Sequence, residues 1–334
     1  MDILSRFVDL VRKEGLFTAI SQSWDYASSE INRINELPYW MYGLYYRTTQ
    51  PSPIKIMDES WDNLIILDAC RYDIFAEECT LNGTLSRVLS PASWSMGYLQ
   101  AEFGDQSFYD TVYVTANPYF PHVADETFHA TIPLFDQWNL DYKTILPSDV
   151  TAAACDAAEM YPNKRLIIHY MQPHTPYIGK KGRQIASIID TGGINFTHSD
   201  DGLKKIHEDL DPMATPSIWD VVADSSTEIS ERDLRKAYRE NLQIVLNEVN
   251  ILLDSITGQT VVTADHGEHL GERLLPFGSK LYGHSLHAPT PQLREIPWLK
   301  IDGGRRRIVS DPPESSPEFN PEEIEQRLVD LGYR

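Results

Sequence analysis

The chain has 334 residues, 42% of them hydrophobic, and this is enough to bury a large core in one α/β domain or in one domain with appendages. Its formal net charge of -20 argues against nucleic acid and anionic membrane surfaces as partners, because the summed field repels phosphates. An anionic substrate would therefore need a local positive centre, such as a metal ion or an arginine.

Residues 1–55 are predicted to form a separate N-terminal segment. Two amphipathic helices are expected between Ile3 and Asn35, followed by an aromatic-rich tether over residues 37–46. The first residues lack the pattern of a secretory signal, and no apolar run is long enough to span a bilayer. We therefore expect a cytoplasmic protein without a transmembrane segment.

Residues 56–334 are predicted to form the catalytic domain, which begins with a buried strand over Asn63–Asp68 and a helix over Arg71–Cys79. A second strand, Thr84–Leu89, leads into a serine-containing segment just ahead of an apolar helical pattern. Because a helix N-terminus presents N–H groups to anions, Ser95 or Ser93 is a candidate nucleophile. A helix cap without chemistry is the alternative.

The next β-α repeats are a strand over Val112–Thr115, which leads to Asn117, and a helix over Val150–Met160. A further buried strand, Arg165–Tyr170, leads into His174, which lies between two prolines that stiffen its loop. Residues 178–225 show little periodicity and are predicted to be an insertion that covers the site as a lid.

The clearest helical period covers Glu231–Ile256 and feeds into a strand over Thr260–Ala264, as expected for a crossover in a parallel sheet. That strand ends in Asp265 and His266. Parallel strands place their carboxyl ends in one crevice, so Asp265 and Asp68 are expected to meet there. Two carboxylates about 4 Å apart repel by about 4 kcal/mol at an effective dielectric near 20, which favours a bound cation.

A strand over Ile296–Ile301 and a helix over Pro321–Leu331 complete the chain. With its motif residues in this order along the chain, the protein resembles the alkaline phosphatase and sulfatase superfamily. Within that superfamily it is most similar to the sulfatase-like hydrolase and transferase branch. The resemblance implies a three-layer α/β sandwich around a mostly parallel sheet, with divalent metal at its carboxyl edge. The segments that carry it are Leu67–Asp73, Trp94-Ser95, Pro173–Tyr177, Thr263–Glu268 and Tyr282–His284.

The resemblance also implies a role for individual residues. Asp68, Asp265 and His266 match metal ligands, and Ser95 lies where the family has its nucleophile. His174 and His284 match residues that contact the substrate anion or protonate the leaving group. Weaker candidates for substrate binding are Arg71, Lys280 and Asn117.

Three departures from the family pattern shape the expected function. The formylglycine signature is absent around Ser95, and Ala69 stands where many sulfatases supply another ligand. His266 after Asp265 favours Zn or Mn over Ca or Mg, because imidazole suits transition metals.

The expected function is a metal-dependent hydrolase or transferase that acts on a small anionic phosphate-type ester through Ser95. A sulfoester hydrolase with the same site, and a catalytically silent binding protein, remain as alternatives. The sequence leaves the oligomeric state open.

Overall fold

The computed structural model describes residue 46 and residues 48–104, 106–122, 127–190, 218–223, 229–274, 280–284, 289–314 and 321–331. The chain separates into two compact units, one made of residues 1–50 with 287–289 and the other of residues 51–286 with 290–334. The expected N-terminal helices and nearly all of the aromatic tether lie outside the described residues. The second unit carries all of the candidate site residues.

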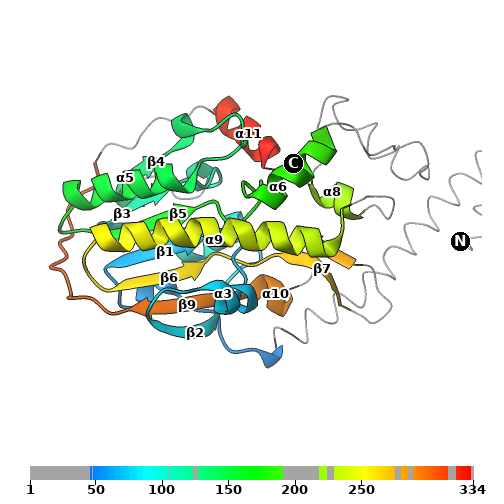
Figure 1. Ribbon diagram of the computed structural model, residues 1–334. Helices are drawn as coiled ribbons and strands as arrows, with labels where there is room; N and C mark the ends of the chain where they lie inside the picture. Colours follow the sequence, from blue (N-terminus) through cyan, green and yellow to red (C-terminus); the bar gives the residue numbers. More distant parts are fainter. Residues whose placement is uncertain are drawn as a thin grey trace, which may run out of the picture. The chain divides into compact units, whose positions relative to one another are not determined.

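A seven-stranded sheet forms the centre of this second unit (Figure 1). β9 runs antiparallel to both of its neighbours, and the remaining pairs are parallel. This is the mostly parallel sheet that the sequence predicts. In spatial order the strands are β2 (Thr84–Leu89), β9 (Glu295–Ile301), β6 (Thr260–Ala264), β1 (Asn63–Leu67), β5 (Arg165–Tyr170), β3 (Phe108–Thr115) and β4 (Phe128–Pro133).

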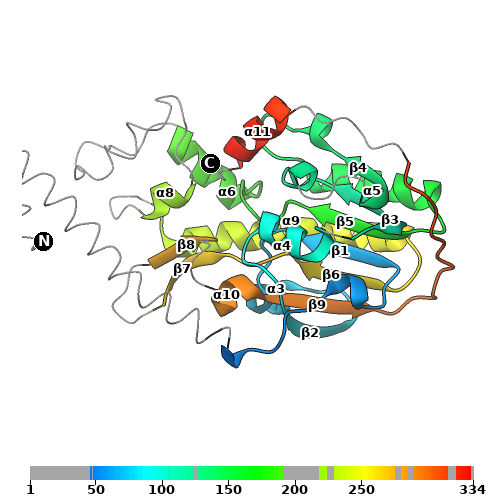
Figure 2. The same cartoon turned by 180° about the vertical axis from the view of Figure 1, so that it is seen from behind.

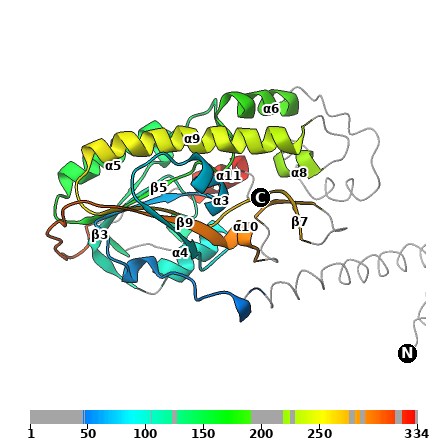
Figure 3. The ribbon, with the colours of Figure 1, turned by 60° about the horizontal axis from the view of Figure 1, so that its bottom comes forward.

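Helices cover both faces of the sheet and complete an α/β sandwich of the expected kind (Figures 1, 2 and 3). On one face α9 (Glu231–Ser255) lies beside α5 (Pro147–Met160) and α3 (Tyr72–Glu78). On the other face lies α4 (Ser95–Phe103), which is seen in front of the sheet in Figure 2. The other helices among the described residues are η1 (Ile56–Asp58), η2 (Phe120–His122), η3 (Phe135–Gln137), α6 (Lys180–Asp190), α8 (Ile218–Ala223), α10 (Pro291–Arg294) and α11 (Pro321–Asp330).

The central strands form where the sequence carries unbroken apolar runs. Every residue of β1 and of β6 is buried, because helices pack against both faces of these strands. The capping of α9 is equally local: the Ser230 side chain accepts a hydrogen bond from the Asp233 N–H, 3.1 Å away. Apolar runs and a helix cap, both visible in the local sequence, therefore determine the elements that lead to the carboxyl edge of the sheet.

Three features were not predicted from the sequence. A two-stranded hairpin of β7 (His269–Arg273) and β8 (Lys280–Gly283) stands apart from the main sheet, and β4 adds a further strand at its edge. Of the expected lid, the structure describes residues 178–190 and 218–223, and these contain the helices α6 and α8. α6 packs on α9, and α8 packs on β8.

Candidate active site

The carboxyl ends of β1 and β6 bring two acids together. Leu67 and Ala264 are partners in the parallel register, so Asp68 and Asp265 leave the sheet side by side. Both carboxyl side chains and the neighbouring His266 are fully buried. One potential ligand atom from each of the three residues lies within 4.8 Å of the others. Two segments that are far apart in sequence thus form one compact donor cluster.

Ser95 reaches this cluster from helix α4, which covers the face of the sheet opposite to α9. It is the first residue of α4, and its side chain is buried. Its hydroxyl donates to Asp265 Oδ2 at 2.8 Å and lies 3.3 Å from Asp68 Oδ2 and 3.2 Å from His266 Nε2. The hydroxyl is therefore within hydrogen-bonding distance of every member of the cluster.

The His266 ring is held in one tautomer by its own loop. Its Nδ1 lies 2.8 Å from the Gly267 carbonyl oxygen, which can only accept a hydrogen bond. The proton consequently resides on Nδ1, and Nε2 directs its lone pair at the Ser95 hydroxyl. Burial, together with the nearby His284, lowers the pKa of His266 well below its usual value. The imidazole is neutral, as a metal ligand must be.

The two acids of the cluster are buried with little compensating charge. Burial raises the pKa of Asp68 well above its usual value, and the negative charges of Asp265 and Glu268 add to this effect. Burial is also the main reason that the pKa of Asp265 is raised. Among the described residues, Asp68 Oδ1 is buried without a hydrogen-bond partner. Two carboxylates and an imidazole with one unused oxygen fit a divalent transition metal.

Ala69 contributes to the cluster through its backbone. It has a left-handed conformation, with φ of 56°, which is uncommon for a residue with a β-carbon. Its N–H donates to Asp265 Oδ1 at 3.0 Å, and its carbonyl oxygen accepts the Tyr238 hydroxyl at 2.7 Å. The backbone of Ala69 therefore orients the Asp265 carboxylate.

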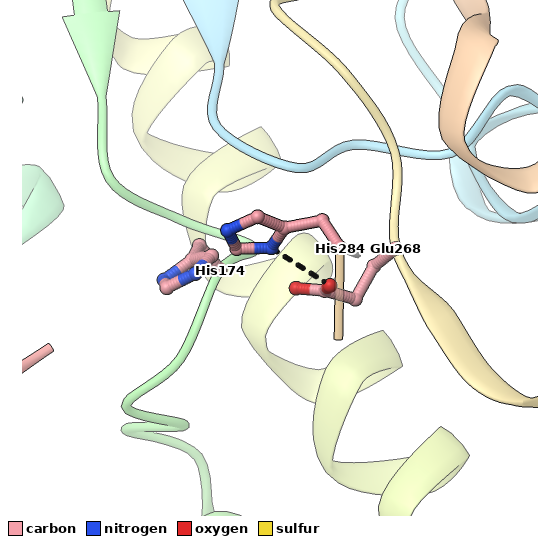
Figure 4. Close-up of side chains that lie close together, drawn as sticks. All are labelled: His174, Glu268 and His284. Atoms are coloured by element: carbon pink, nitrogen blue, oxygen red, sulfur yellow. Dashed lines mark hydrogen bonds and ion pairs between the residues drawn. The ribbon is translucent and has the colours of Figure 1, made fainter. Parts of the chain in front are cut away.

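A second cluster, made of His174, Glu268 and His284, adjoins the first (Figure 4). The close-up shows the His284 ring turned toward Glu268, with Nδ1 3.0 Å from Oε1. The His284 ring centroid lies 5.3 Å from that of His174 and 4.7 Å from that of His266. The two clusters thus form a continuous polar edge, with Ser95 on one side and the His284–Glu268 pair on the other.

The two histidines of the second cluster differ in protonation. Burial lowers the pKa of His174 to about 3, so this ring is neutral. Burial also acts to lower the pKa of His284, but the Glu268 carboxylate, through its charge and its hydrogen bond, raises it above the usual value. His284 is therefore the group suited to donate a proton, whereas His174 is a weak base that stays neutral and is suited to bind a cation.

The weaker substrate-binding candidates have other partners. Asn117 donates to Asp68 Oδ2 at 2.9 Å and accepts from the Tyr119 N–H, so it orients the Asp68 carboxylate. The guanidinium of Arg71 is bound to Asp73 and Glu272, and Lys280 is paired with Glu231 on α9. Arg71 and Lys280 are therefore both paired with carboxylates of the protein, and the expectation that they bind the substrate anion stays a prediction.

Glu268 is the site residue that sequence reasoning passed over. It lies two residues beyond His266, where the chain leaves the sheet edge, and its side chain is fully buried. Among the described residues, its Oε2 has no hydrogen-bond partner. An acid directly after an Asp-His-Gly segment was the available signal, but only the fold of β7 and β8 brings it to His284.

The fold is the one that the resemblance to the alkaline phosphatase and sulfatase superfamily implies, and the motif residues converge at one edge of its sheet. No protein-family model matches the chain, and no curated protein matches it in sequence. Comparison with solved structures finds proteins of low sequence identity.

One is the integral membrane protein lipooligosaccharide phosphoethanolamine transferase A from Neisseria meningitidis, with 12% identity and a TM-score of 0.44 over 90% of this chain and 63% of that one. Another is the periplasmic domain of the Escherichia coli EptC protein in complex with Zn, with 12% identity and a TM-score of 0.46 over 76% and 77% of the two chains.

A third is a candidate sulfatase from Bacteroides thetaiotaomicron, with 12% identity and a TM-score of 0.46 over 75% and 66% of the two chains. The cytoplasmic location expected from the sequence stays a prediction. Within the described residues, no helix is both long and apolar enough to cross a bilayer.

Proposed function

We propose that this protein is a metal-dependent enzyme that cleaves or transfers a phosphate-type ester group through a Ser95 nucleophile. The observation that carries the proposal is the Ser95 oxygen, which lies 2.8 Å from Asp265 and 3.2 Å from His266 in a buried cluster suited to a divalent cation. A helix cap without chemistry would not need two buried carboxylates and a neutral imidazole around its hydroxyl.

Asp68, Asp265 and His266 would hold the cation, and the imidazole favours Zn or Mn over Ca or Mg. A bound cation lowers the pKa of a nearby hydroxyl and offsets the charge of a phosphoryl group. Asn117 and the Ala69 N–H fix the two carboxylates, so the donor set is organised before any ligand arrives.

The protein groups around Ser95 suit nucleophilic attack. Asp265 Oδ2 accepts the hydroxyl hydrogen and is the group placed to take the proton as the Ser95 oxygen bonds to phosphorus. Because Ser95 opens α4, the positive end of that helix faces the incoming anion. The phosphorus–oxygen bond to the leaving group then breaks, and a phosphoserine forms.

The second cluster is positioned to protonate the leaving group and to activate the group that attacks the phosphoserine. The His284 imidazolium, paired with Glu268, would donate its proton to the departing oxygen. The same ring, now neutral, would accept a proton from the water or acceptor hydroxyl that attacks the phosphoserine. The bond between phosphorus and the Ser95 oxygen would then break, and that oxygen would recover its proton from Asp265. The choice between water and an acceptor hydroxyl decides between hydrolase and transferase, and the substrate is a small anionic ester in both cases.

The test compares Ser95→Ala with Ser93→Ala, which alters a serine two residues ahead of α4. Metal-stripped protein is supplied with Zn, Mn, Mg or Ca and assayed with aryl phosphate, phosphodiester, phosphonate and aryl sulfate esters. We expect Ser95→Ala to lose turnover by more than about 1,000-fold and Ser93→Ala to retain it. Acid-quenched wild-type protein should contain phosphoserine at position 95, as detected by mass spectrometry.

Equal activity in the two variants would contradict the proposal. Turnover of sulfate esters alone would favour a sulfoester hydrolase with the same residues. Absence of both turnover and metal uptake would favour a catalytically silent binding protein.

A further inference from the structure

Arg71 joins the first metal-ligand loop to the hairpin that carries the second cluster. It lies three residues after Asp68, and its N–H donates to the Tyr238 hydroxyl at 3.0 Å. The same hydroxyl donates to the Ala69 carbonyl oxygen. A side chain of the long helix α9 therefore fixes the backbone from which the Arg71 side chain extends.

The guanidinium of Arg71 is buried, with 3% of its side chain exposed, and it binds on two sides. Toward the surface it makes a bidentate contact with Asp73, at 2.9 Å and 2.6 Å. Toward the interior its Nη1 donates to Glu272 Oε1 at 2.5 Å and to the Glu268 carbonyl oxygen at 3.2 Å. Asp73 thus orients the guanidinium. The guanidinium in turn binds Glu272 of β7 and the backbone of Glu268, the residue that precedes β7.

The hairpin β7–β8 determines where the Glu268–His284 pair lies. Glu268 immediately precedes β7, and His284 immediately follows β8. Other contacts that hold the hairpin include the ion pairs of Arg235 with Glu272 and of Lys280 with Glu231, the contact of His269 with Thr290, and the Trp219 ring against Gly283. Of these residues, Arg71 is the one that donates to the backbone of Glu268 itself.

We propose that Arg71 is a positioning residue for proton delivery to the leaving group. It places Glu268, and through Glu268 the His284 ring, while the Ser95 cluster keeps its own supports in Asn117 and Ala69. The inference rests on the proposed function. Loss of Arg71 should then weaken the departure of the leaving group more than the attack of Ser95.

The test uses two Arg71 variants and a matched control. Arg71→Lys keeps the charge but cannot reach both sides at once. The double variant Arg71→Met with Glu272→Gln removes the arginine without leaving the Glu272 charge buried and short of a partner. Arg239→Met is the control, since Arg239 also binds two carboxylates, Glu77 and Glu78, but joins α9 to α3 instead of to the hairpin.

A series of aryl phosphates separates a positioning role from a general structural one. Good leaving groups such as 2,4-dinitrophenol depart without a proton, whereas phenol needs one. We expect both Arg71 variants to lose about 30- to 100-fold in kcat/KM with phenyl phosphate and less than about 3-fold with dinitrophenyl phosphate. The Arg239→Met protein should show neither change.

An equal loss across the whole series, or no loss with phenyl phosphate, would overturn the inference. Amide hydrogen exchange adds a readout that needs no turnover: exchange in β7 and β8 should be at least about tenfold faster in the Arg71 variants and unchanged in Arg239→Met. If the wild-type protein cleaves no ester, the proposed function fails. Unchanged hairpin exchange would then overturn the placement role of Arg71 separately.

Discussion

Gly267 shows how a single residue shapes the site. It lies between His266 and Glu268, and its N–H donates to the Leu293 carbonyl oxygen at 2.9 Å. A β-carbon at this position would overlap the Gln292 carbonyl oxygen, a clash that no side-chain rearrangement can relieve. The glycine therefore allows the site loop to pass directly against the backbone at α10.

We expect Gly267→Ala to displace both neighbours of the glycine. The predicted result is a loss of stability of about 2–4 kcal/mol, as for other overpacked buried sites, and a loss of activity of more than about 100-fold. Gly304→Ala is the control, since nothing lies within 4 Å of a β-carbon there. Urea unfolding and ester turnover measure the two effects, and equal behaviour of the two variants would contradict the explanation.

At the scale of one residue, sequence reasoning identified which side chains meet but not all of their partners. Asp68, Asp265 and His266 follow strands whose parallel order the sequence indicates, so their meeting was predictable. The partners of Arg71 were not, because Glu272 belongs to a short hairpin with a glycine inside it and no alternating pattern. The role of Arg71 depends on contacts with Glu272, which lies about 200 residues further along the chain.

At the scale of an element, helix α4 carries a buried acid near its C-terminal end. Glu102 is 5% exposed, and its Oε2 accepts the Ile56 N–H at 3.1 Å. Burial, assisted by Asp58, raises the pKa of Glu102 from 4.5 to about 7. Because this group releases its proton more readily in the unfolded chain, its contribution to stability falls as the pH rises from 4.5 to 7.

Glu102→Gln should remove this pH dependence, since the amide oxygen can accept the same hydrogen bond without carrying charge. We expect the variant to be more stable than the wild-type protein by up to about 3 kcal/mol at pH 8 and equally stable near pH 4.5. Chemical denaturation at both pH values measures the difference. Glu159→Gln, an exposed acid near the C-terminal end of α5, should change stability by less than about 0.5 kcal/mol. A stabilisation that is independent of pH would contradict the assignment.

The elements themselves were predictable to different degrees. The bounds predicted for β5 and β6 match the structure, because each strand is built around apolar residues and is buried along almost its whole length. β4 was not predicted, since an edge strand with half-buried positions lacks that signal. The helices α6 and α8 were not predicted, because residues 178–225 show little periodicity; these helices pack against α9 and β8.

At the scale of the whole molecule, the formal net charge of -20 sets the response to salt. Like charges on a compact protein repel one another, and dissolved ions screen that repulsion. We expect sodium chloride, raised from 0.05 M to 1 M at pH 7.5, to stabilise the fold by on the order of 1 kcal/mol, or about 2 °C in Tm. Near pH 4.8, the isoelectric point, the same salt should have little effect. An equal shift at both pH values would exclude charge screening as the cause.

The distance along the chain between the two acids of the first cluster has a consequence for biosynthesis. Ala69 and the carboxylate that it orients are separated by 196 residues, and β1 pairs directly with both β5 and β6. During translation, Asp68 is synthesised long before Asp265 and His266. The growing chain therefore carries at first only one of the three residues of the cluster. Cation capture would then follow synthesis of the β6 segment, so pulse-labelled chains arrested before residue 260 should release metal to a mild chelator and longer ones should retain it.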